Sequence, residues 1–172
     1  MDKKLLDKLK KIKLLALDFD GVLTDGYVYI NQQGEETVRC SRKDSLGTNI
    51  LQAIGIYVVV ISKEVNPIVE MRCKKMKVDC YYGVQDGKDK LSILKFYALE
   101  RTISLDEIVY IGDDVNDIEC IQAVGVGVTV ADGHPDCKAI ADYIMKRRGG
   151  EHAVREVCDL ILKARGGQEH VD

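Results

Sequence analysis

Two groups of aspartates each follow a short apolar segment directly. The first group follows Leu14–Leu17 and the second follows Ile108–Ile111. The members are Asp18 and Asp20 in the first group, and Asp113, Asp114 and Asp117 in the second. Carboxylates gathered this densely repel one another and normally need a cation to neutralise them. Mg²⁺ is a suitable cation because it prefers oxygen ligands. Because parallel strands end at a common edge of their sheet, we expect one site there.

The segments around these aspartates alternate between strand-like and helix-like patterns. Ile56–Ile61 is continuous and β-branched, which is typical of a buried parallel strand. Asp44–Ala53 has the apolar spacing of a helix, and Gly55 ends it. Further helices are expected over 66–75, 88–99, 116–124, 134–141 and 152–163, and further strands over 80–82 and 126–130. The alternation predicts an α/β fold with a doubly wound parallel sheet.

One segment interrupts this alternation. Tyr27–Ile30 and Glu36–Cys40 flank a polar turn at 31–34, which predicts a small β-hairpin after the first strand. The hairpin is too small to form a separate lid domain. With 172 residues and no repeat or long linker, we expect a single domain over 1–172.

Composition excludes several classes of protein. A net charge of −3 argues against a nucleic-acid partner, and no apolar segment is long enough to span a membrane. Residues 1–13 alternate lysines with apolar residues, which fits membrane-surface binding or, in the reading we favour, a short amphipathic helix leading into the first strand. The 6 cysteines form no C-x-x-C pair, and no secretory signal is present, so we expect reduced thiols in the cytoplasm.

The segment Asp18–Gly26 reads Asp-Phe-Asp-Gly-Val-Leu-Thr-Asp-Gly and resembles the first motif of the haloacid dehalogenase superfamily of phosphotransferases. The order of Ser62, Lys90 and Asp113 along the chain agrees with that resemblance. It implies that Asp18 is a nucleophile, which splits hydrolysis into two steps through an aspartyl-phosphate. Asp20 would then protonate the leaving alkoxide and later accept a proton from water.

The same resemblance assigns the metal and phosphate contacts. It implies that Mg²⁺ takes side-chain oxygens from Asp18 and Asp113 and the backbone carbonyl of Asp20, and that the cation offsets charge on the transferring phosphoryl group. Asp114 and Asp117 would support these ligands or reach metal-bound water. Phosphoryl oxygens would be held by Ser62 and Lys90.

A narrower resemblance is to the capless phosphatases of 2-keto-3-deoxy sugar acid phosphates. The tail 148–156 resembles their Gly-Gly-x-Gly-Ala-Val-Arg-Glu tail, with His152 in place of a glycine. It implies a homotetramer in which the hairpin and tail of each subunit help to close a neighbour's site. Arg155 is accordingly a candidate for substrate binding.

The segment after Ile56–Ile61 bears on the substrate. Relatives acting on 3-deoxy-D-manno-octulosonate (KDO) 8-phosphate typically have Thr-Gly-Arg here, whereas this chain has Ser62-Lys63-Glu64. Glu64, followed by Arg72 and Lys75, resembles relatives acting on nine-carbon acids, the 9-phosphates of N-acetylneuraminate or of its deaminated analogue KDN. Glu64 would accept hydrogen bonds from a polyol, and the two cations would pair with its carboxylate. We therefore predict a nine-carbon substrate, with KDO 8-phosphate as the alternative.

Of three other functions with related sequence patterns, two conflict with the order or type of residues in this chain. The Ser-Lys-Glu-x-Asn-Pro segment also resembles the phosphatase-like domain fused to some acylneuraminate cytidylyltransferases, which would make the chain an assembly module. A phosphorylatable receiver would place its acidic pair early and its phosphorylated aspartate later, the reverse of this order. A calcium loop starting at Asp18 would need glutamate at position 29, which is Tyr29. A catalytic role for the aspartates remains our prediction.

Overall fold

The structure, a computed structural model, describes residues 2–166. It contains a six-stranded sheet in the order β5-β4-β1-β6-β7-β8, and every neighbouring pair of strands is parallel. The strands are β1 (Leu14–Leu17), β4 (Tyr57–Ile61), β5 (Asp79–Tyr81), β6 (Ile108–Gly112), β7 (Val126–Thr129) and β8 (Tyr143–Ile144). The first strand therefore lies inside the sheet, between β4 and β6. This arrangement confirms the predicted doubly wound sheet.

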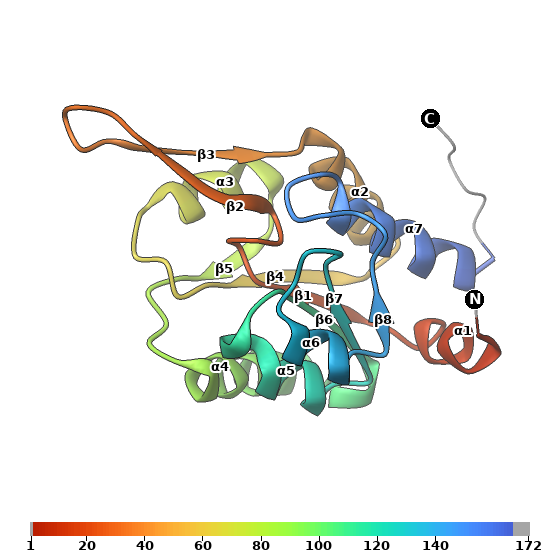
Figure 1. Cartoon of the computed structure of the whole chain (residues 1–172). Coiled ribbons are helices and arrows are strands. Elements are labelled where there is room, and N and C mark those ends of the chain that lie inside the picture. Colours follow the sequence, from red (N-terminus) through yellow and green to blue (C-terminus); the bar gives the residue numbers. More distant parts are fainter. Residues whose placement is uncertain (1, 167–172) are drawn as a thin grey trace.

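Helices cover both faces of the sheet and make a three-layer structure (Figure 1). They are α1 (Lys3–Leu9), α2 (Arg42–Ala53), α3 (Ile68–Met76), α4 (Gly87–Glu100), α5 (Ile118–Ala123), α6 (Pro135–Ile140) and α7 (Ala153–Ala164), with two 3-10 turns, η1 (Leu105–Glu107) and η2 (Val115–Asp117). Most predicted elements match within a few residues. The helix expected over 116–124 divides into η2 and α5, and the two-residue β8 was not predicted.

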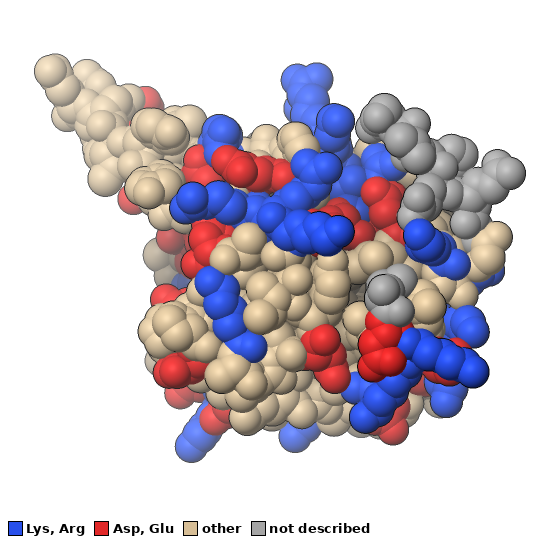
Figure 2. Space-filling view, turned by 45° about the vertical axis from the view of Figure 1, so that its right-hand side comes forward, with Lys and Arg blue, Asp and Glu red and all other residues tan. Residues whose placement is uncertain are grey.

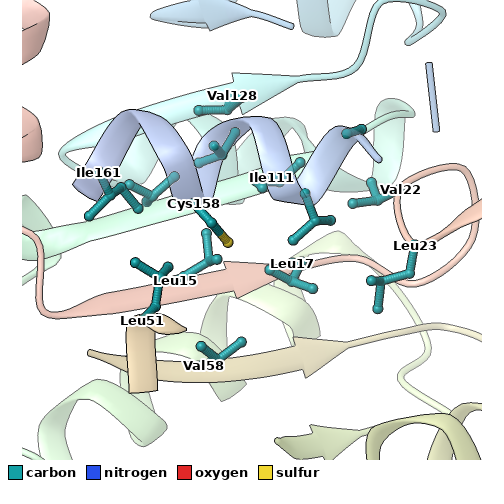
Figure 3. Close-up of a cluster of buried hydrophobic side chains, with 14 of the residues drawn as sticks. Leu15, Leu17, Val22, Leu23, Leu51, Val58, Ile111, Val128, Cys158 and Ile161 are labelled. Carbon is teal, nitrogen blue, oxygen red and sulfur yellow. The ribbon is translucent and has the colours of Figure 1, made fainter. Parts of the chain in front are cut away.

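The alternation of side chains along β1 divides the core into two layers. Leu15 and Leu17 pack under α2 and α7, together with Cys158 and Ile161 of α7 (Figure 3). Leu14 and Ala16 face the opposite way, into the cluster that α4, α5 and α6 cover. All four β1 side chains are buried, which explains why the segment reads as a continuous apolar run rather than an alternating one.

The predicted hairpin is formed by β2 (Thr24–Ile30) and β3 (Glu36–Cys40), and it projects beyond the layers (Figure 1). It begins directly after the first aspartate pair. Asn66, between β4 and α3, donates a hydrogen bond to Glu36 of β3 at 3.0 Å. The hairpin therefore lies over the loop that follows β4.

Helices α2 and α7 pack side by side, and their N-termini exchange polar contacts. Asp44 of α2 accepts a hydrogen bond from the backbone N–H of Arg155 at 2.8 Å. His152, just before α7, lies with Nδ1 2.5 Å from the hydroxyl of Ser41, which caps α2. Each helix thus satisfies backbone or capping groups at the start of the other.

Basic side chains gather over the upper part of one face of the molecule, with acidic side chains among them (Figure 2). Within residues 2–166, no helix is both long and apolar enough to cross a membrane.

Candidate active site

The two aspartate groups meet because β1 and β6 are neighbouring strands. The backbone N–H of Asp18 donates to the carbonyl of Ile111 at 2.9 Å, which continues the ladder between the two strands. The loop after β1 then turns at Gly21, with φ +69°, and a Cβ there would lie 1.9 Å from Oδ2 of Asp113. Only glycine fits this approach of backbone to carboxylate. The predicted common site at the carboxyl edge of the sheet is thus formed.

Three carboxylates lie together at this edge. Asp18, Asp113 and Asp117 each offer one oxygen, and these oxygens lie within 4.8 Å of one another. Burial raises the pKa of Asp113 to about 7, and the charges of Asp117 and Asp114 add to this effect. A hard cation would offset both the cost of burying these charged carboxylates and the repulsion between them. The donor set therefore fits a magnesium ion.

Lys90 joins this cluster from the first turn of α4. Its side chain is fully buried, and its Nζ lies 2.6 Å from Oδ2 of Asp18 and 2.8 Å from Oδ1 of Asp117. Burial alone would lower the pKa of Lys90, but the two carboxylates outweigh it and raise the pKa. Burial also raises the pKa of Asp18, as does Asp117, while Lys90 opposes this shift. Lys90 is therefore a buried ammonium shared by two carboxylates.

Asp20 lies on the more open side of the same loop. Its Oδ1 accepts the hydroxyl hydrogen bond of Thr24 at 3.2 Å. Burial raises the pKa of Asp20, Thr24 opposes the rise, and the charge of Glu64 increases it. A raised pKa keeps a larger fraction of the carboxyl group protonated, which suits a proton donor.

Ser62 follows β4, on the other side of β1. It is buried, and its Oγ accepts the N–H of Glu64 at 3.1 Å, so its own hydroxyl proton can be donated elsewhere. The Glu64 carboxylate accepts the N–H groups of Val65 and Asn66, both at 2.7 Å. Glu64 thus shapes its own loop, and its backbone contact with Ser62 and its effect on the pKa of Asp20 place it near these two residues.

Asp114 and Asp117 take different positions. Asp117 is buried within the cluster, and its Oδ2 accepts the N–H of Asp113 at 3.0 Å. Asp114 is exposed, and its Oδ1 accepts the N–H of Val115 at 2.7 Å, which caps η2. Of the two expected supporting residues, the structure brings only Asp117 into the carboxylate cluster.

The cations expected at the substrate have described contacts elsewhere. Arg72 donates from Nη2 to the carbonyl of Ser41 at 2.6 Å and to Oγ of Ser45 at 2.8 Å, both at the start of α2. Arg155 is buried, with Nε 2.8 Å from Asp159. Lys75 is exposed on the last turn of α3, at the opposite edge of the sheet from Asp18. The structure thus places none of the three beside the carboxylate cluster of the same chain.

One contact of the cluster was missed by the sequence analysis. Tyr110 in β6 is fully buried, and its hydroxyl donates to Oδ1 of Asp117 at 2.7 Å. The available signal was a tyrosine inside an otherwise aliphatic strand, since a buried tyrosine hydroxyl usually has a hydrogen-bond partner.

Comparison with known proteins agrees with this fold and identifies the family. Residues 56–157 match the family model of the haloacid dehalogenase-like hydrolases. The chain is 36% identical over 151 residues to the KDO 8-phosphate phosphatase of Escherichia coli strain K12. The matched segment covers 88% of this chain and 79% of that protein. The chain therefore belongs to the haloacid dehalogenase-like hydrolase family.

Two crystal structures show the particular group within that family. The KDO 8-phosphate phosphatase of Moraxella catarrhalis, in complex with magnesium, phosphate and KDO, superimposes with a TM-score of 0.91 at 35% identity, over 96% of this chain and 94% of that one. The corresponding enzyme of Yersinia pestis gives a TM-score of 0.93 at 33% identity, over 99% and 91% of the two chains. The similarity extends over nearly the whole of both proteins, which confirms the predicted capless fold.

Proposed function

We propose that this protein is a Mg²⁺-dependent phosphatase that hydrolyses the phosphate monoester of a 2-keto-3-deoxy sugar acid. The observation that carries the proposal is the buried Asp18, held between Lys90 and the carboxylates of Asp113 and Asp117. The names of the relatives support the substrate class. The intact cluster also favours an active enzyme over an assembly module for a cytidylyltransferase.

The reaction would take place in two steps at Asp18. In the first, an Asp18 oxygen attacks phosphorus, the bond to the sugar oxygen breaks, and Asp20 gives its proton to that oxygen. In the second, a water attacks the aspartyl-phosphate, Asp20 takes a proton from the water, and phosphate leaves with Asp18 restored. Ser62 donates to a phosphoryl oxygen, and Lys90 contributes its positive charge.

Magnesium, when bound by Asp18, Asp113 and the Asp20 carbonyl, would lower the repulsion between an anionic nucleophile and an anionic ester. The direct test is phosphate release from KDO 8-phosphate and from a nine-carbon 9-phosphate, with Mg²⁺ and with excess chelator. Full activity in the chelator, or no release from any sugar acid phosphate, would contradict the proposal.

Asp20 should matter most when the leaving group is poor. We expect Asp20→Asn to slow phosphorylation of the enzyme by a sugar phosphate roughly a hundredfold or more, but to slow it much less with p-nitrophenyl phosphate, whose phenolate leaves largely unaided. Rapid-quench measurement of the first turnover separates this step from hydrolysis of the intermediate. Equal losses with both substrates would remove Asp20 from the role of acid.

We further propose a nine-carbon acid as the preferred substrate. The proposal rests on Glu64, which lies close enough to Asp20 to raise the pKa of Asp20 and which replaces the arginine of Thr-Gly-Arg. An anion in place of a cation changes which groups of a sugar acid can be paired. KDO 8-phosphate is the second candidate, and the activity of the named relatives favours it.

Glu64→Arg tests this choice. Wild type should have the higher kcat/KM for the nine-carbon substrate, and the substitution should shift the ratio toward KDO 8-phosphate by roughly ten- to a hundredfold, because an unpaired polar contact costs about 1–3 kcal/mol. Glu64→Gln keeps an oxygen for the loop N–H groups and isolates the effect of charge. Glu70→Arg, on an exposed position of α3, is the matched control. A wild-type preference for KDO 8-phosphate would overturn the nine-carbon assignment.

A cytoplasmic homotetramer is proposed on the same resemblance. The hairpin supports it, since Tyr27, Tyr29 and Ile30 are 68%, 58% and 67% exposed on its two faces, and large apolar side chains exposed close together often mark an interface. A neighbouring subunit would also provide the cover that a capless site lacks. Light scattering on the active protein should give the mass of four chains, and a fully active monomer would refute the proposal.

A further inference from the structure

Tyr110 is a buried polar group that the reaction described above does not use. It is the central residue of β6, fully buried, and the residues on both sides of it in the strand are aliphatic. The ring belongs to the apolar cluster under α4 and α5, while the hydroxyl reaches Oδ1 of Asp117 at 2.7 Å. The hydroxyl thus meets the carboxylate cluster from inside the core.

The oxygen that Tyr110 contacts has a second donor. Oδ1 of Asp117 also accepts from Nζ of Lys90 at 2.8 Å, and the same Nζ lies 2.6 Å from Asp18. The other oxygen, Oδ2, accepts the N–H of Asp113 at 3.0 Å. One carboxylate therefore joins the lysine beside the nucleophile to the backbone of a proposed metal ligand, and its orientation sets both contacts.

We infer that Tyr110 is a positioning residue, which fixes the Asp117 carboxylate so that Lys90 and Asp113 are held in the geometry needed for catalysis. The inference rests on the proposed function and adds to it a residue that touches neither substrate nor metal. Without the hydroxyl, Lys90 is the one donor to Oδ1 of Asp117 that remains among residues 2–166. The Asp117 carboxylate is then free to turn toward Lys90. This rotation draws the Lys90 ammonium away from Asp18 and loosens the contact of Asp117 with the N–H of Asp113. Residues that orient metal ligands in this way commonly matter nearly as much as the ligands.

Tyr110→Phe removes the hydroxyl and leaves the ring in place. We expect this variant to bind Mg²⁺ roughly tenfold more weakly or worse, and to lose about as much in kcat, while KM for the sugar acid phosphate changes little. Calorimetric titration with Mg²⁺ in the absence of substrate measures the first effect independently of turnover.

Tyr97→Phe provides the matched control. Tyr97 is also a buried tyrosine of the same apolar cluster, and its hydroxyl donates to a carboxylate, Asp79, at 2.6 Å. Asp79 begins β5 at the opposite edge of the sheet from Asp18. Both substitutions lose a tyrosine–carboxylate hydrogen bond, so both should lower the melting temperature. Only Tyr110→Phe should weaken Mg²⁺ binding and lower kcat.

A double-mutant cycle tests the route of the effect. If Tyr110 acts through Asp117, then Tyr110→Phe should have little further effect on Mg²⁺ affinity in an Asp117→Asn background. Additive losses would overturn the inference, as would a Tyr110→Phe variant that matches Tyr97→Phe in Mg²⁺ affinity and kcat. A wild type with no Mg²⁺-dependent phosphatase activity would instead contradict the proposed function.

Discussion

Replacing Asp18 with asparagine should reduce phosphate release by roughly a thousandfold or more, because the amide keeps the shape of the side chain but is not an anionic nucleophile. An asparagine oxygen can still accept from Lys90, which now lies 2.6 Å from the carboxylate, so the fold should be retained. The measurement is kcat on a sugar acid phosphate at saturating Mg²⁺, with circular dichroism to verify folding.

Asp114→Asn is the control for that experiment. Asp114 belongs to the same group of aspartates in the sequence, but it is exposed and caps η2. Asparagine is also a good capping residue, so activity should stay within a few-fold of wild type. A rate close to wild type in Asp18→Asn, or an equal loss in Asp114→Asn, would contradict the assignment of the nucleophile.

Lys90→Met should be the most damaging substitution for both activity and stability. Methionine fills much of the same space but leaves the buried carboxylates of Asp18 and Asp117 without their ammonium partner. Breaking a buried ion pair by removing one member costs about 3–5 kcal/mol. We expect a large fall in the melting temperature of the metal-free protein and loss of detectable turnover.

The dependence of stability on pH and Mg²⁺ shows whether the loss of stability in Lys90→Met comes from the unpaired carboxylates. Burial already raises the pKa of Asp18, so its protonated form favours the folded state and stability falls as pH rises through the folded pKa. Without Lys90 this effect grows, and the deficit of Lys90→Met should be larger at pH 7 than at pH 5. Added Mg²⁺ should restore part of the stability. Lys88→Met, an exposed neighbour, should change neither property, and a deficit that is independent of pH would argue for lost packing instead.

The sequence was informative wherever a residue type and its position in the chain together determined its place. Asp18 and Asp113 could be brought together because each directly follows an apolar strand, and the carboxyl ends of parallel strands share an edge. Lys90 was more difficult, since Lys88 has the same charge two residues earlier. Only the structure shows that the helix buries Lys90 and leaves Lys88 exposed.

The contacts of the cations depended on packing that no local pattern records. Arg72 is predicted to bind substrate, and within the chain it extends from α3 to the start of α2, where it donates to the Ser41 carbonyl. Arg155 likewise is buried where α7 packs on α2. Tyr110 is read as one more residue of a buried strand until the structure shows which carboxylate its hydroxyl meets.

The pairing of α2 with α7 has a consequence for how the chain is made. Asp44 and Arg155 are 111 residues apart in sequence, yet they close the same side of the sheet. The strands β1 and β6 are synthesised before α7. Until α7 leaves the ribosome, Leu15, Leu17 and Ile111 lack the helix that covers them (Figure 3). The nascent chain must keep this apolar face from aggregating until α7 emerges. Folding of this layer is therefore completed only after α7 has been synthesised, and a ribosome stalled before α7 would present a chaperone substrate rather than a partial enzyme.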